Sequence, residues 1–72
     1  MISEEKIDKL YDDARNESRQ AVEELIDIVM SNENVEIRRL AWQRLEGIYY
    51  STSESFSAWA DKRVMQRGAR RP

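Results

Sequence analysis

The stretch SNENVEIRRLAWQRLEGIYY, residues 31–50, predicts a polar turn followed by a helix. The first four residues have the composition of a turn, and Asn32 or Asn34 can cap the helix that follows. The helix carries one apolar stripe and three flanking aromatic residues: Ile37, Leu40, Ala41, Leu45 and Ile48, then Trp42, Tyr49 and Tyr50. This is more apolar and aromatic surface than one side of a small helix needs, so we expect part of it to contact another protein chain.

Upstream of this stretch, the sequence predicts one long helix over residues 4–30. Ser3 is a good N-cap, and acidic residues follow it in the first turn, where they favour the positive end of the helix dipole. The weak point is residues 16–18, Asn-Glu-Ser, because Asn and Ser side chains compete for backbone hydrogen bonds; we expect the helix to continue through them. Apolar or small residues recur along it at the four-three spacing of a coiled-coil seam: Ile7, Tyr11, Ala14, Ser18, Ala21, Leu25 and Ile28.

Downstream, Ser51 and Glu54 match a capping box and predict a third helix. Gly68 is a suitable C-terminal stop for that helix. The sequence therefore predicts an all-α domain of three helices, the first one long, over residues 1–67, and a flexible basic tail over residues 68–72. Apolar residues of the third helix again follow three-four spacing: Phe56, Trp59, Ala60 and Val64.

Residues 21–50 contain an apolar helix, an Asn-rich turn and a second helix that opens with Ile37-Arg38 and continues with Ala41, Leu45 and Ile48. This order of elements resembles a single HEAT-type helical hairpin. Repeats of that family need about three units to bury a continuous core, and this chain has no second copy. The resemblance therefore implies an antiparallel pair of helices with an exposed ridge, rather than a solenoid.

The chain has 72 residues, so it forms at most one domain. A core of this size supplies only roughly 3–5 kcal/mol, and small domains often add oligomerisation. We therefore expect a homodimer or higher oligomer joined along the seam Ile7 to Ile28. No apolar run approaches the ~18–20 residues of a membrane span, and the acidic N-terminus lacks the apolar region of a signal peptide. We expect a cytoplasmic protein.

The composition argues against an enzyme or a cofactor. The chain has no Cys and no His, which removes disulfides, thiolate nucleophiles, the usual zinc ligands and the commonest general base. Acidic residues are interleaved with bases at helical spacing, as in the pair Glu5 and Lys9, which is typical of a solvated helix face. The serines of residues 51–57 have no His partner and are explained by a helix cap. We expect no metal, no cofactor and no catalysis.

Charge is divided between the two halves of the chain. Residues 1–36 hold eleven acidic and four basic residues, a net charge of −7, whereas residues 37–72 hold three acidic and eight basic residues, a net charge of +5. This asymmetry indicates either attraction between the halves within a fold or two faces with different partners. The basic C-terminal segment could also contact nucleic-acid phosphates through four arginines: Arg63, Arg67, Arg70 and Arg71.

We therefore predict a small non-enzymatic protein-interaction module, such as an adaptor or an inhibitor that occupies a partner's surface. Small acidic helical proteins of phages and mobile elements offer an analogy. The alternative is a small nucleic-acid-associated regulator that uses the basic C-terminal segment. Trp, Tyr and Arg dominate interface hot spots, so the expected partner-binding residues are Trp42, Tyr49, Tyr50, Arg38 and Arg39.

Overall fold

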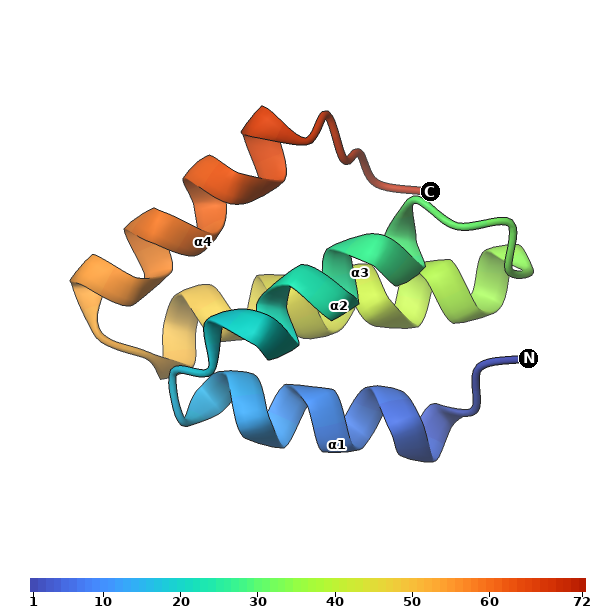
Figure 1. Ribbon diagram of the computed structural model, residues 1–72, viewed down its shortest axis with the longest axis horizontal. Coiled ribbons are helices and arrows are strands. Elements are labelled where there is room, and N and C mark those ends of the chain that lie inside the picture. The colour runs from blue at the N-terminus through green and yellow to red at the C-terminus, as the bar shows by residue number, and fades with distance from the viewer.

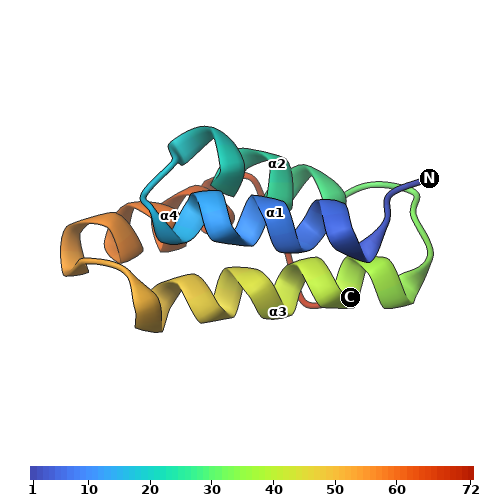
Figure 2. The same ribbon diagram turned by 90° about the horizontal axis from the view of Figure 1, so that it is seen from below.

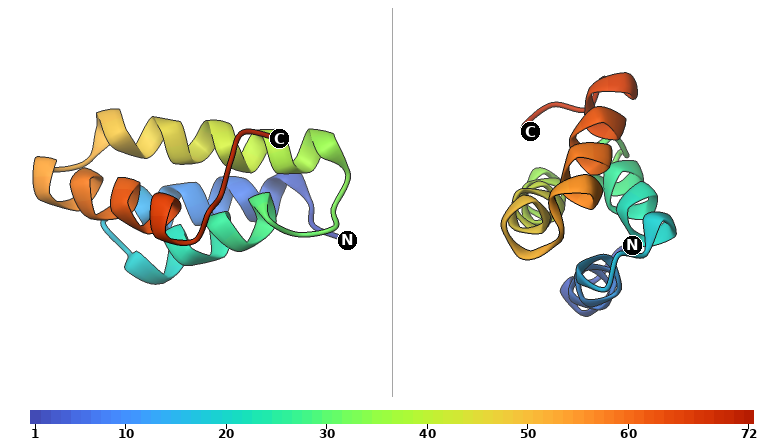
Figure 3. Two further views of the ribbon diagram at one scale, coloured as in Figure 1. Left: turned by 90° about the horizontal axis from the view of Figure 1, so that it is seen from above. Right: turned by 90° about the vertical axis from the view of Figure 1, so that its left-hand side faces the viewer.

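The computed structural model describes all 72 residues and contains four α-helices and no strand (Figure 1). The central helices α2 and α3 run antiparallel to each other. Helix α1 packs against both on one side and α4 packs against both on the other, and α1 and α4 do not meet (Figure 3). The bounds of the helices are α1 Glu4–Arg15, α2 Arg19–Val29, α3 Val35–Ser51 and α4 Glu54–Gln66.

The prediction of three helices with a long first one is wrong, because the chain turns back at Glu17. This residue adopts a φ of 65°, in the left-handed region. The Glu17 N–H donates to Ala14 O and the Ser18 N–H donates to Asp13 O, which together form a Schellman motif that ends α1. Ser18 Oγ then accepts a hydrogen bond from the Ala21 N–H and caps α2. At residues 16–18, the expected weak point of the long helix, α1 therefore ends and a separate helix, α2, begins.

The boundary between α3 and α4 also differs from the predicted capping box. Ser51 is the last residue of α3, and its hydroxyl donates to Gly47 O. The N-cap of α4 is Ser53, whose Oγ accepts from the Phe56 N–H. Three other predicted ends are confirmed. Ser3 and Asn34 cap α1 and α3 through their side chains, and α4 stops just before Gly68, which has a φ of 71°.

The core draws apolar residues from all four helices, and no polar residue is buried. Of the predicted oligomer seam, Tyr11 and Ser18 are partly exposed and the other five side chains are buried within this single chain. The turn at Glu17 lets α1 cover α2 and α3, so these side chains pack against the chain's own helices. The core residues are Ile7, Leu10, Ala14, Ala21, Val22, Leu25, Ile26, Ile28, Val29, Ala41, Leu45, Ile48, Phe56, Ala60 and Val64.

Gly47 of α3 faces the side chain of Tyr11 on α1, and the two helices lie side by side in Figure 2. A Cβ atom at position 47 would lie 2.8 Å from Tyr11 Oη and 3.1 Å from Tyr11 Cε1. The guanidinium groups of Arg15 and Arg44 each lie 5.5 Å from the centre of the Tyr11 ring. The glycine therefore weakens the helix locally but makes room for this ring. None of the four helices is long and apolar enough to cross a membrane.

Candidate protein-binding face on helix α3

Helix α3 has two opposite stripes, because one side packs on the core and the other faces away from it. Positions 36, 43 and 50 repeat every seven residues and so lie on nearly the same side of the helix. All three are exposed, and Tyr50 is 90% exposed. We call the outward stripe the α3 ridge; it consists of Glu36, Arg39, Gln43, Glu46 and Tyr50.

Two hollows flank the α3 ridge. The first, of about 460 Å³, lies beside the start of α1 and is lined by Glu4, Ile37 and Leu40 together with ridge residues. The second, of about 360 Å³, lies beside the C-terminal segment and is lined by Trp42, Arg71 and Pro72 together with the ridge residues Arg39, Gln43 and Glu46. Arg39 and Gln43 line both hollows, so they form the wall between them.

Trp42 is packed more deeply than the sequence suggested. Its side chain is partly buried against the core, and its indole Nε1 is fully buried with no hydrogen-bond acceptor. Buried indole N–H groups usually have a partner. Trp42 thus combines a structural role with a position on the wall of the second hollow.

The two neighbouring tyrosines separate, as expected from their adjacent positions on a helix. Tyr50 points to solvent, whereas Tyr49 is partly buried where α3 meets α4. Burial of its hydroxyl, with the nearby carboxylates of Asp61 and Glu46, raises the pKa of Tyr49 to about 12. Tyr49 therefore contributes to the contact between the helices, and Tyr50 is the aromatic residue of the ridge.

The two predicted binding arginines also have different environments. Arg38 Nε donates to Glu33 O at 3.0 Å and holds the turn before α3. Arg39 is exposed, and its only recorded polar contact is a long hydrogen bond of 3.4 Å from Nε to Pro72 O. Of the five predicted partner-binding residues, Arg39 and Tyr50 lie on the ridge and Trp42 lines a hollow, whereas Arg38 and Tyr49 make contacts within the chain.

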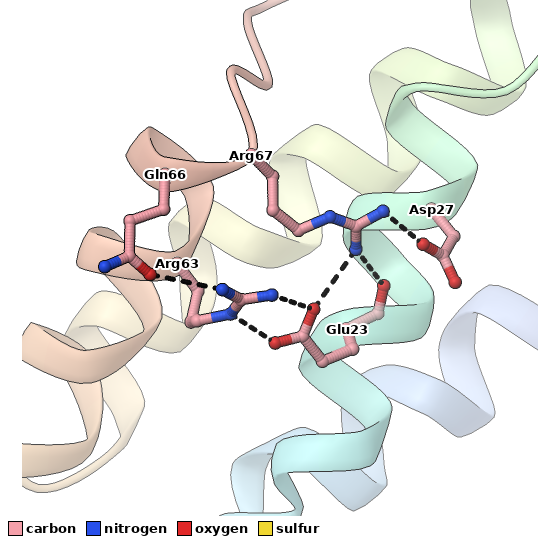
Figure 4. Close-up of polar contacts among 5 residues, drawn as sticks. All are labelled: Glu23, Asp27, Arg63, Gln66 and Arg67. Carbon is pink, nitrogen blue, oxygen red and sulfur yellow. Dashed lines mark hydrogen bonds and ion pairs between the residues drawn. The ribbon is translucent and has the colours of Figure 1, made fainter.

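A polar cluster joins α4 to α2 on another side of the molecule (Figure 4). Arg63 makes a bidentate contact with the carboxylate of Glu23, through Nε and Nη2. Arg67 Nη1 donates to the carboxylate and to the carbonyl oxygen of Glu23, and its Nη2 donates to Asp27. Hydrogen bonding from Arg63 is the main cause that holds the pKa of Glu23 below its ordinary value.

These contacts occupy most of the arginines expected to bind phosphates. Arg63 and Arg67 are engaged with Glu23 and Asp27, and Arg71 lies 3.5 Å from Glu46. Arg70 is exposed and makes no ion pair. The ion pairs Glu23–Arg63, Glu23–Arg67, Asp27–Arg67 and Asp8–Arg44 link the acidic half of the chain to the basic half.

The shifted pKa of Glu23 gives a prediction about pH. Because the folded-state pKa is lowered, the carboxylate stabilises the fold above its ordinary pKa of 4.5, and this contribution disappears as the pH falls through the folded-state value. We expect Glu23→Gln to lower the unfolding free energy at neutral pH by about 1 kcal/mol, a modest value because the group keeps some contact with solvent. Thermal melts of both proteins from neutral to acidic pH should converge below pH 4.5.

The matched control for this prediction is Asp8→Asn, which removes the more exposed ion pair with Arg44. We expect it to change the melting temperature less than Glu23→Gln does. If the difference between wild type and Glu23→Gln were the same at every pH, the Glu23 carboxylate would not be the stabilising group.

No known protein family, curated protein or solved structure matches this chain. The resemblance of residues 21–50 to a HEAT-type hairpin therefore stays a prediction, although α2 and α3 do form an antiparallel pair (Figure 1). The structure contains no group of three or more acidic, His or Cys side chains arranged to hold a metal ion. The α3 ridge and its two hollows are thus the strongest candidate for a functional surface.

Proposed function

We propose that this chain is a small, non-enzymatic, cytoplasmic protein-interaction module, an adaptor or an inhibitor, that binds another protein chain through the α3 ridge and its two hollows. The observation that carries the proposal is Tyr50, which is 90% exposed on a ridge bounded by two hollows. A ring in solvent contributes nothing to the core of a domain that has so little core. Tyr is also among the residues that dominate binding hot spots.

The shape and chemistry of this face suit a protein helix. Helices pack by inserting the ridge of one into the groove of the other, and the α3 ridge lies between two such grooves. The grooves expose parts of Ile37, Leu40 and Trp42, and the ridge supplies charges of both signs. Both grooves are lined mostly by polar and charged residues around these few apolar side chains, which suits the polar surface of a non-obligate interface.

A nucleic-acid role for the C-terminal arginines has less support. Arg63 and Arg67 are paired with the carboxylates of Glu23 and Asp27, and Arg71 lies beside Glu46. A phosphate-driven complex would have to break these pairs, and its affinity would fall steeply with salt. Complexes made through the α3 ridge should depend less steeply on salt than a phosphate complex, because the ridge carries charges of both signs.

Site-specific photo-crosslinking tests the proposal. A photoreactive phenylalanine analogue replaces Tyr50, an aromatic exchange at an exposed position that the fold should tolerate. The same analogue replaces Gln20 as the control, because Gln20 is exposed on α2, which packs against the opposite, buried side of α3. We expect a specific adduct from position 50 in cells and none from position 20.

The adduct must also depend on the chemistry of the ridge. Gln43→Lys in the crosslinking chain should reduce its yield, and Gln20→Lys should not. Titration of the identified protein against wild type and Tyr50→Ala should then show a loss of about tenfold or more in affinity. The absence of an adduct at position 50, or equal adducts at both positions, would overturn the proposal.

A further inference from the structure

We infer that the chain bound at this face is a second copy of the same protein, with the two α3 helices antiparallel about a two-fold axis that passes through Gln43. This inference rests on the proposed function, since it uses the same ridge and hollows.

The order of charges along the ridge is self-complementary in one direction only. In an antiparallel pair centred on Gln43, residues at equal distances before and after position 43 face each other. Arg39 then lies opposite Gly47 and next to Glu46 of the other copy, so guanidinium meets carboxylate twice. Glu36 lies opposite Tyr50, whose hydroxyl can donate to the carboxylate.

The axis itself suits the residue that occupies it. A glutamine amide has both a donor and an acceptor, so the two Gln43 side chains can form two hydrogen bonds with each other. A parallel pair in the same register would instead place Arg39 against Arg39 and Glu46 against Glu46, which costs free energy. Only the antiparallel arrangement gives every polar residue of the ridge a complementary partner.

The surface relief agrees with the same symmetry. A two-fold interface is isologous, so one patch must carry both the projecting part and the part that receives it. The wall formed by Arg39 and Gln43 of one copy is the projecting part, and the hollows on either side of it can receive the wall of the other copy. The contacts that now hold Arg39 and Glu46, to Pro72 O at 3.4 Å and to Arg71 at 3.5 Å, are long and exposed.

Sedimentation equilibrium from micromolar to millimolar concentration tests the inference. Wild type should shift with concentration from the monomer mass of 8.6 kDa toward twice that mass. Gln43→Lys, which places two like charges on the axis, should weaken the dimer at least about tenfold. Gln20→Lys, the same substitution on the far side of the molecule, should leave it unchanged.

Charge exchange between chains gives the sharpest result. Arg39→Glu alone brings two carboxylates together at each contact, and Glu46→Arg alone brings two guanidinium groups together, so each variant by itself should stay monomeric. In an equal mixture, a heterodimer of the two variants has opposite charges at both of its contacts between positions 39 and 46. The two carboxylates of the Arg39→Glu chain face the two guanidinium groups of the Glu46→Arg chain. The mixture should therefore form a heterodimer close to the wild-type affinity. All substituted positions are exposed or partly exposed, and circular dichroism melts should show that each variant folds as wild type does.

Three outcomes would overturn the inference: a wild type that stays at 8.6 kDa throughout, a mixture that stays monomeric, or a dimer equally weakened by Gln20→Lys. The proposed function fails separately. If wild type is monomeric and position 50 crosslinks to a different protein, the second copy is not the occupant, but the α3 ridge is still a binding face. If position 50 gives no adduct, both the proposed function and the inference of a second copy are overturned.

Discussion

Leu25→Ala is expected to leave most of the protein unfolded near room temperature. Leu25 lies on α2 at the centre of the core and is 0% exposed. Replacing a fully buried leucine by alanine typically costs about 2–5 kcal/mol, from lost burial and the cavity left behind. That is close to the whole stability of roughly 3–5 kcal/mol that a domain of this size has. Urea and thermal unfolding followed by circular dichroism measure the loss.

The control for this prediction lies on the same helix. Gln20→Ala changes an exposed residue of α2 and should alter the unfolding free energy by less than about 0.5 kcal/mol. A shift of only a degree or two in the melting temperature of Leu25→Ala would mean that Leu25 is not at the centre of the core.

Gly47→Val is expected to lower the unfolding free energy by about 1–3 kcal/mol, although valine favours a helix slightly more than glycine does. Its Cβ would lie 2.8 Å from Tyr11 Oη, too close unless α1 or the Tyr11 ring moves away. The ring has little freedom, because Arg15 and Arg44 cover it. Thermal melts of the variant measure this cost.

A second substitution checks the cause. Tyr11→Phe removes the nearest atom, Oη, so it should recover part of the stability lost in Gly47→Val while having a smaller effect in the wild-type background. If the two substitutions were simply additive, the loss would come from valine in the helix and not from the Tyr11 contact.

The helices themselves could be predicted from the sequence because their periodicity and several of their caps are local signals. The break in the first predicted helix could not, and the reason is visible at position 17. Glu17 and Gly68 occupy equivalent places in two Schellman motifs with the same hydrogen-bond pattern. A glycine such as Gly68 is the usual residue at the left-handed position after a helix, so it can be recognised in the sequence. Glutamate rarely adopts a positive φ, so Glu17 gives no such signal. Burial of α1 against α2 and α3 outweighs the local cost, and that gain depends on contacts distant in sequence.

The candidate site could be predicted in part. An excess of aromatic residues pointed to Trp42, Tyr49 and Tyr50. The structure leaves Tyr50 exposed on the α3 ridge, whereas Trp42, which lines a hollow, and Tyr49 are both partly buried against the core. Gln43 and Glu46 gave no sequence signal, because the outward side of α3 is fixed only when α1 and α4 cover the other sides. The pairing of Arg63 with Glu23 was equally hidden, since forty residues separate them. The division of charge left open whether the halves attract each other or bind different partners, and four ion pairs between the halves now show attraction within the fold.

The central proposal is that another chain binds on the α3 ridge and that the bound chain is a second copy of the same protein. A dilution series of amide nitrogen–proton NMR spectra of the labelled protein measures this association residue by residue. We expect concentration-dependent shifts at Glu36, Arg39, Gln43, Glu46 and Tyr50, and none at exposed positions of α2 such as Gln20 and Asp27. Spectra that do not change with concentration, or shifts that gather on α2 instead of α3, would contradict it.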